Sequence, residues 1–171
     1  GMQASKVIPT YKHFPGLGRV KDNTDTSANV VDGTTNRQSD AAVGVFANAI
    51  SAGAQVIMVS SATYSLIDPS APAVFSSKIV TEMLRTEMGF SGVVITDDVS
   101  AAVQVQSMAA GDRAVQAIRA GCDIVLASAD PTVAADMIKA LITTAQSDPA
   151  FAARVDESAT RVLNLKKSLQ S

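Results

Sequence analysis

The amino-acid sequence predicts an α/β fold in which helices cover a parallel sheet built from βα units. Short apolar runs alternate along the 171-residue chain with segments of helical spacing. These apolar runs are continuous rather than alternating in polarity, as expected for strands that are buried on both faces. The long polar connections all follow strands, whereas the joints from helix to strand are tight glycine turns. Long loops at one edge of a sheet are typical of the edge that carries the site.

The elements follow one another in a regular order. Strands are expected near residues 7–12, 55–60, 92–97 and 122–127. Helices are expected over residues 41–50, from 76 or 77 to 88, 112–120 with Asp112 as the N-cap, 131–146 and 149–169. Residues 19–36, 63–72 and 97–111 are expected to be loops. Four βα units are too few to close an eight-stranded barrel, so the pattern indicates either a small open sheet or half of a barrel.

The composition excludes several classes of protein. Hydrophobic residues make up 47% and charged residues 18% of the chain, which fits one globular core and excludes disorder. The net charge of −2 gives no basic surface for nucleic acid. The single Cys122 cannot form an internal disulfide, and no Cys/His cluster has the spacing of metal ligands, so no metal or cofactor is expected. Because the apolar runs are too short for a membrane span and no secretion signal is visible, we expect a soluble chain whose parent protein is cytoplasmic or exported.

Two motifs place chemical groups at strand ends. Lys12-His13-Phe14-Pro15-Gly16 follows the first strand and contains the sole histidine. Gly92-Val93-Val94-Ile95-Thr96-Asp97-Asp98 delivers two carboxylates at the end of the third strand. Since parallel strands end at the same edge of a sheet, we expect both motifs to contribute to one site.

These motifs resemble those of the family 3 glycoside hydrolases, and within that family the β-N-acetylhexosaminidase branch. The segments Met58–Ala62 and Ala120-Gly121-Cys122-Asp123 also fit, so the similarity covers nearly the whole chain. The resemblance implies a TIM-type (β/α)8 barrel, of which this chain is the second half, strands five to eight. Residues 1–171 are then a single partial domain.

The resemblance also implies roles for individual residues. Asp97 takes the position of the nucleophile, while Asp98 is expected to point elsewhere, because neighbouring strand residues face opposite sides. The alternative for this pair is that both carboxylates cap loop amides. Lys12 and His13 match the pair that binds sugar hydroxyls, the alternative being a solvated lysine and a packed histidine. Ser60 follows the second strand and is expected to line the pocket, although serine is common in loops.

One departure from the family pattern concerns the proton donor. The hexosaminidase branch carries Asp-Ser-His in the first loop, where this chain has Asn23, Thr24 and Asp25. The histidine of the His/Asp dyad is therefore absent. Asp25 is the candidate acid/base, as carboxyls serve in most glycosidases; the alternative is a solvated loop acid.

The resemblance thus implies a retaining glycosidase that hydrolyses terminal β-linked N-acetylglucosamine from glycans or peptidoglycan fragments, with a role in cell wall recycling and no cofactor. A second reading is a non-catalytic carbohydrate-binding or degenerate half-barrel that self-associates. Half a barrel leaves sheet edges and apolar surface uncovered. We therefore expect a homodimer or a pairing with the missing N-terminal half-barrel, and weak or no activity of the isolated chain.

Overall fold

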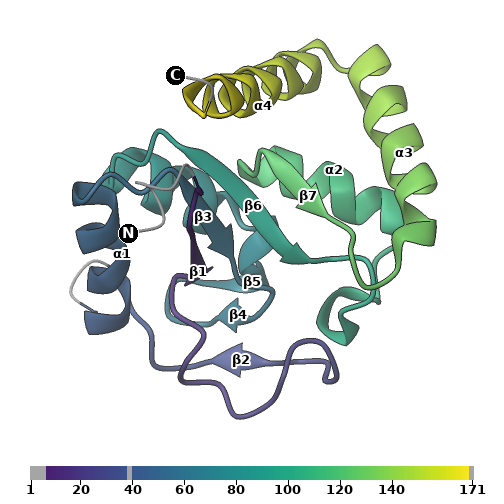
Figure 1. Cartoon of the computed structure of the whole chain (residues 1–171). Helices are drawn as coiled ribbons and strands as arrows, with labels where there is room; N and C mark the ends of the chain where they lie inside the picture. The colour runs from purple at the N-terminus through teal and green to yellow at the C-terminus, as the bar shows by residue number, and fades with distance from the viewer. Residues whose placement is uncertain (1–6, 38–39, 170–171) are drawn as a thin grey trace.

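The computed structural model describes residues 7–37 and 40–169. Its main sheet has four parallel strands in the order β1-β3-β6-β7 (Figure 1). The strands are β1 (Thr10–Phe14), β3 (Val56–Val59), β6 (Val93–Asp98) and β7 (Ile124–Leu126). The predicted parallel sheet is confirmed, but β1 both starts and ends later than expected, so Lys12 and His13 lie within the strand and do not follow it. The carboxyl ends of all four strands lie at one edge, because each strand pairs in parallel with its neighbour.

The helices follow the predicted order with local corrections. They are α1 (Ala41–Ser51), the π-helix η3 (Lys78–Glu87), α2 (Ala110–Ala120), α3 (Ala134–Ser147) and α4 (Pro149–Ser168). Two 3₁₀ turns, η4 (Val103–Val105) and η5 (Pro131–Val133), precede α2 and α3, and a third, η2 (Ala73–Phe75), precedes η3. Asp112 is not the N-cap of α2: that helix begins earlier, after Ala109, and Asp112 lies in its first turn, where a carboxylate favours the positive end of the helix dipole.

A second, small sheet corrects the expectation that residues 19–36 and 63–72 are structureless. Its strands are β2 (Val31–Asp32), β4 (Thr63–Tyr64) and β5 (Asp68–Pro72). β4 lies in the middle, parallel to β2 and antiparallel to β5. Proline is tolerated in β5 because this is an edge strand. In Figure 1 the small sheet lies beyond the carboxyl ends of β1 and β3, on the side of the expected site.

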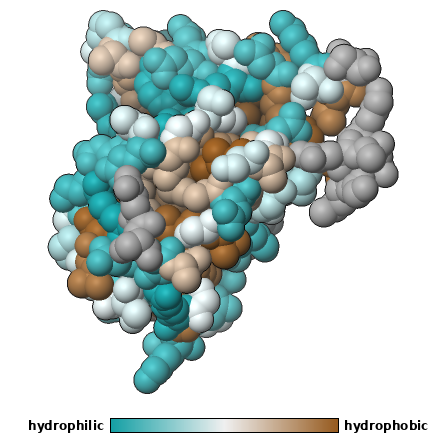
Figure 2. Space-filling model, turned by 90° about the vertical axis from the view of Figure 1, so that its left-hand side faces the viewer, coloured by the Kyte–Doolittle hydropathy of each residue, from teal (hydrophilic) through white to brown (hydrophobic). Residues whose placement is uncertain are grey.

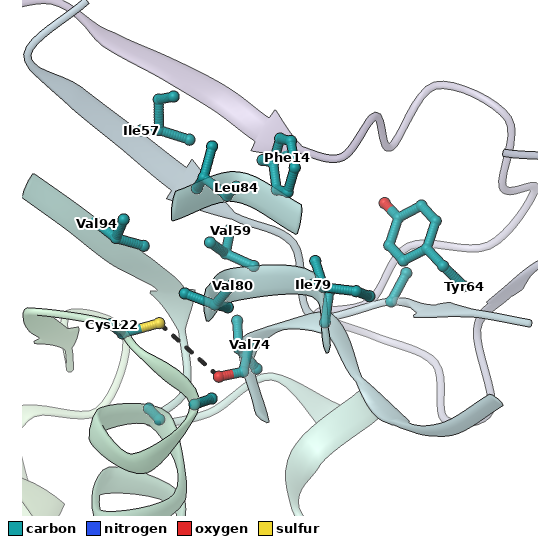
Figure 3. Packing of buried hydrophobic residues seen from close by; sticks show 14 of the residues in the cluster. Phe14, Ile57, Val59, Tyr64, Val74, Ile79, Val80, Leu84, Val94 and Cys122 are labelled. Carbon is teal, nitrogen blue, oxygen red and sulfur yellow. Dashed lines mark hydrogen bonds between the residues drawn. The ribbon is translucent and has the colours of Figure 1, made fainter. Parts of the chain in front are cut away.

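The hydrophobic core lies between the main sheet and the helices that cover it. Ile57 and Val59 from β3 and Val94 from β6 pack with Val80 and Leu84 of η3, all fully buried (Figure 3). Since side chains alternate across a strand, these core positions show which face of each strand the helices cover.

Two further contacts close the ends of this core. Phe14, at the end of β1, meets Phe46 of α1 edge to face, with ring centroids 5.2 Å apart. The Cys122 thiol donates to the Val74 carbonyl at 3.8 Å, and burial raises the pKa of this thiol to about 12 (Figure 3). Cys122 is therefore a packing residue.

The buried carboxylate of Asp123 attaches α4 to the sheet. Its Oδ2 accepts from Arg85 of η3 at 2.5 Å and from the Val94 amide at 2.9 Å. Its Oδ1 accepts from Arg154 at 2.9 Å and from Arg161 at 3.2 Å, both on α4. α4 lies at the amino-terminal ends of the strands, opposite the expected site (Figure 1). Within residues 7–37 and 40–169, none of the helices combines the length and apolarity required for a membrane span.

Candidate active site

The two aspartates at the end of β6 point to different sides of the sheet. Val94 faces the helices, so alternation places Asp97 with Val93 and Ile95 on the opposite face. Asp98 turns to the loop after β7, where its Oδ2 accepts from the amide and the hydroxyl of Ser128, both at 2.7 Å. The different orientations of the pair agree with the sequence-based prediction.

The hydrogen bonds of Asp98 make it a structural residue. Its Oδ1 accepts from the Ser100 amide at 2.8 Å and from the Ser100 hydroxyl at 2.6 Å. Burial alone would raise the pKa of Asp98, but these donors and those of Ser128 and Ala129 lower it far below its usual range. A carboxylate held this way stays ionised and joins the ends of β6 and β7.

His13 and Asp97 face one another across the strand ends. The His13 Nε2 lies 3.7 Å from the Asp97 Oδ2, and the two side chains are 23% and 17% exposed. Both line a cavity of about 490 Å³. The cavity is lined by Lys12, His13, Leu17, Val20, Lys21, Asp22, Asn23, Thr24, Asp25 and Asp97. The structure therefore brings together four of the five predicted site residues: Lys12, His13, Asp25 and Asp97.

The electrostatics of this cavity differ from those of an exposed surface. Partial burial lowers the pKa of His13, against the opposing charges of Asp97 and Asp25. Partial burial also raises the pKa of Asp97, with a further contribution from the negative charge of Asp25. His13 thus favours its neutral form, which can both donate and accept hydrogen bonds. Perturbed titratable groups of this kind gather at functional sites.

Ser60 lies outside the cavity. Its side chain is fully buried, its Oγ accepts from the Ala62 amide at 3.0 Å, and its own amide donates to the Phe14 carbonyl at 2.9 Å. These contacts fix the turn after β3 beside the end of β1. These hydrogen bonds indicate a structural role for Ser60 and do not support contact between Ser60 and a ligand.

Asp25 reaches the cavity from the long loop after β1. Asn23 organises a turn there: its Oδ1 accepts from the Asp25 amide at 2.8 Å, and its carbonyl accepts from the Ser27 amide at 2.9 Å. Asp25 is itself exposed, whereas Thr24 is buried beneath it. The turn thus presents the carboxyl group at the cavity wall.

The sequence interpretation missed Asp32, which organises the rest of this loop. Its carboxylate is buried and accepts from the amides of Thr34 and Thr35, both at 2.7 Å, and from the Thr35 hydroxyl at 2.6 Å. Arg19 then joins Thr35 to Asp40, the N-cap of α1. The segment Asp32-Gly33-Thr34-Thr35 has the composition of an Asx-turn and was the available signal.

The cavity is a polar site that carries carboxylates. Among the residues that the structure describes, no group of three or more His, Cys, Asp or Glu side chains is arranged to hold a metal ion. A half-buried carboxylate beside an imidazole, with a second carboxyl and a lysine on the same cavity, can bind hydroxyl groups and perform nucleophilic and proton-transfer chemistry.

Comparisons with known proteins show the family to which the chain belongs. The model of the "Glycosyl hydrolase family 3 N terminal domain" matches residues 1–165. A beta-hexosaminidase of Psychromonas ingrahamii is 37% identical over 141 residues, 81% of this chain and 41% of the relative. An uncharacterized secreted glycosyl hydrolase of Arthroderma benhamiae is 33% identical over 98% of this chain and 48% of its own length.

Two solved structures give the same result. The crystal structure of a beta-N-acetylhexosaminidase from Beutenbergia cavernae superposes with a TM-score of 0.96 at 58% identity, covering 97% of this chain and 49% of that one. A glycoside hydrolase family 3 beta-N-acetylglucosaminidase from Paenibacillus follows with a TM-score of 0.88 at 28% identity, covering 99% of this chain and 33% of that one. The chain spans about half the length of the first relatives that it matches, or less.

Proposed function

Since the chain belongs to glycosyl hydrolase family 3, we propose that it is the half of a (β/α)8 barrel, strands five to eight, that supplies the nucleophile of a retaining β-N-acetylhexosaminidase. The family resemblance predicted from the two motifs is confirmed by these comparisons. The observation that carries the proposal is the cavity in which Asp97, His13, Lys12 and Asp25 meet at the carboxyl ends of the strands. In parallel barrels this edge is the catalytic one.

The proposed reaction uses these residues in two steps. A carboxylate oxygen of Asp97 attacks the anomeric carbon of a terminal β-linked N-acetylglucosamine, while Asp25 gives its proton to the departing glycosidic oxygen. Water then attacks the glycosyl-enzyme ester, Asp25 takes the proton from that water, and Asp97 is released. Lys12 and His13 bind sugar hydroxyls, a task that suits a cation and a neutral imidazole. The sugar itself is inferred from the relatives' names.

The raised pKa of Asp97 gives a pH prediction for this mechanism. Asp97 must be ionised to attack, so kcat/KM increases as the pH rises through its pKa. Because partial burial raises this pKa, the acid limb should lie above the ordinary aspartate value of about 3.9. A pH–rate profile of kcat/KM tests this. A limb at or below the ordinary value would contradict the proposed environment of Asp97.

We further propose that four more βα units complete this half-barrel. Within the described residues, β1 pairs only with β3 and β7 only with β6, so both edges of the sheet are open. Beside β7, an apolar groove of about 580 Å³ lies between the strand and the helices α3 and α4. Ile138 and Leu163 at this groove are 57% and 56% exposed. In Figure 2, hydrophobic side chains also lie exposed between the upper part of the molecule and the body below it.

A second copy of the chain can supply the four units when the other half is absent. Two-fold pairing of β7 with the partner's β1 joins eight parallel strands and covers both open edges. Light scattering should give twice the 17.6 kDa chain mass at micromolar concentration. Adding the half of the Beutenbergia cavernae enzyme that this chain does not match should convert the homodimer into a mixed pair. A monomer that stays a monomer after this addition would contradict the proposal.

The catalytic assignment is tested on the chain alone and on the mixed pair, with an aryl β-N-acetylglucosaminide as substrate. The isolated chain should be weakly active or inactive, because half of the barrel's contributors are missing. In the mixed pair, Asp97→Asn should lower kcat/KM by at least about 10³-fold and Asp25→Asn by about 10²–10⁴-fold. With an aryl group that departs without protonation, mass spectrometry should find the glycosyl group on Asp97 in the Asp25→Asn variant, because only hydrolysis of the ester then still needs the missing base.

The second reading, a non-catalytic carbohydrate-binding half-barrel, rests on one observation. By the family resemblance, Asp25 takes the place of the loop histidine of the hexosaminidase branch, and the sequence has no histidine other than His13. This reading predicts that N-acetylglucosamine binds to the mixed pair without turnover and that Asp97→Asn leaves that binding unchanged. Calorimetry beside the activity assay therefore separates the two functions.

A further inference from the structure

The loop that carries Asp25 is bonded directly to the segment that follows Asp97 and Asp98. η4 begins a few residues after the end of β6 and runs alongside the loop. The Val103 amide donates to the Asp25 carbonyl at 3.2 Å, and the Gln104 amide donates to the Thr24 carbonyl at 3.1 Å. The two carboxyl groups of the site therefore come from backbone segments that hold each other.

The side chain of Gln104 makes the second half of this contact. Its Oε1 accepts from the Val30 amide at 2.8 Å, and its Nε2 donates to the Val30 carbonyl at 3.2 Å. The amide thus bonds both backbone groups of one residue, as a neighbouring strand would. Val30 is 3% exposed, and Gln104 is itself partly buried, so water competes poorly for these bonds.

The segment on the other side of this contact is itself fixed. The Gln106 side chain donates to the Ser100 carbonyl at 2.9 Å, and the buried guanidinium of Arg113 donates to the Val99 carbonyl at 2.7 Å. Asp98 holds Ser100 in addition. η4 is therefore a rigid base, whereas the turn around Asn23 has exposed residues on both sides.

We propose that Gln104 is a positioning residue that holds the Asp25 loop at a fixed place relative to Asp97. The proposal rests on the proposed function, because the position matters for proton transfer to a sugar attacked by Asp97. It follows from the four hydrogen bonds between the two segments, of which Gln104 contributes three. A misplacement of about 1 Å of a catalytic group can cost about 10²-fold in rate.

The test uses Gln104→Met, which keeps the length of the side chain and removes both side-chain hydrogen bonds. Gln106→Met is the matched control, because Gln106 follows the same 3₁₀ turn but bonds Ser100 instead of the loop. Hydrogen exchange of the amides of residues 23–30 should become at least tenfold faster in Gln104→Met and stay unchanged in Gln106→Met. Gln104→Glu retains the acceptor for the Val30 amide and should give an intermediate rate.

The sole histidine provides a second readout that needs no turnover. The groups that act on the charge of His13 are Asp97, Lys12 and Asp25. Because the Asp25 charge raises the pKa of His13, Asp25→Asn should lower it, and Gln104→Met should shift it in the same direction by releasing the loop. NMR titration of the His13 ring measures this shift. A general loss of structure would instead change exchange throughout the core, including the amides of β3 and β6.

Three outcomes decide the proposal. Faster exchange confined to the loop, with a His13 shift in the direction of Asp25→Asn, supports it. If Gln104→Met has the same loop hydrogen exchange and the same His13 pKa as Gln106→Met, the proposal is overturned. Faster exchange throughout the core would also overturn it, since Gln104 would then serve the fold as a whole. Failure of the proposed function shows separately, as turnover that is insensitive to Asp97→Asn.

Discussion

Asp123 gives the sharpest prediction for stability, because one buried carboxylate holds three arginines. Asp123→Asn removes the charge and places an amide group opposite donors of Arg85, Arg154 or Arg161. The Asp123 side chain is completely buried, and those of Arg85 and Arg154 are 12% and 18% exposed. Breaking a buried pair by removing one partner costs about 3–5 kcal/mol. Typical domains have only about 5–15 kcal/mol of stability, so the variant should be close to unfolding.

Urea unfolding followed by circular dichroism measures this loss, with Glu157→Gln as the matched control. Glu157 contacts the same Arg154 and Arg161, but its side chain is 61% exposed. A surface pair of this kind contributes about 0–1 kcal/mol. The free energy of unfolding should therefore fall by several kcal/mol in Asp123→Asn and by less than about 1 kcal/mol in Glu157→Gln. Equal losses in the two variants would refute the idea that α4 is attached through Asp123.

The same network predicts how stability depends on pH. Burial alone would raise the pKa of Asp123, but the positive charges of Arg85 and Arg154 lower it below its usual value. A group whose folded pKa is depressed contributes stability above its unfolded pKa of about 3.9 and loses it as the pH falls through the folded value. The wild type should therefore lose stability in acid, and Asp123→Asn should lose less over the same range.

Two more variants test single contacts. Gly121→Ala should destabilise the chain by roughly 1–3 kcal/mol, because Gly121 has φ +118° and a Cβ there would meet the Thr81 hydroxyl oxygen at 2.5 Å. Gly44 lies inside α1, where an added Cβ would have nothing within 4 Å. Gly44→Ala should therefore stabilise the chain by about 0.5–1 kcal/mol. A shift in the same direction for both would contradict this. Asp98→Ala should speed exchange of the Ser128 amide at least tenfold and lower the urea midpoint; an unchanged rate would show that the loop after β7 is held by other contacts.

The order of strands and helices could be predicted because a local sequence pattern specifies each element. Continuous apolar runs such as Val56–Val59 are short and bounded by polar residues. The end of α2 could be predicted from Gly121 alone, because glycine readily adopts the positive φ that ends a helix. Asp97, Lys12 and His13 could be predicted to meet for the same reason, since parallel strands end at one edge. These predictions require no knowledge of how distant segments pack.

The remaining features depend on contacts between segments far apart in the sequence. β2 is two residues long and exists because Val31 and Asp32 pair with Thr63 and Tyr64; no local pattern specifies such a pairing. The orientation of the Ser60 side chain could not be predicted either, because the alternation of side chains along β3 ends with the strand at Val59. The contact between Gln104 and Val30 joins residues 74 positions apart and leaves no trace in either segment.

The contrast between Asp97, Asp98 and Asp123 shows that an aspartate at either end of a strand can be structural or a candidate catalytic residue. Asp123 and Asp98 each accept hydrogen bonds from several protein donors, and the pKa of each is lowered. Among the residues that the structure describes, one such donor reaches Asp97, the Asp98 amide at 2.9 Å, and partial burial raises the pKa of Asp97. A carboxylate whose lone pairs are all occupied is a poor nucleophile, whereas one that is half-buried and sparsely bonded can bind to an electrophilic carbon. The number of donors therefore separates the two structural aspartates from the candidate nucleophile. Many of these donors come from segments far apart in the sequence: the loop after β7 for Asp98, and η3, β6 and α4 for Asp123.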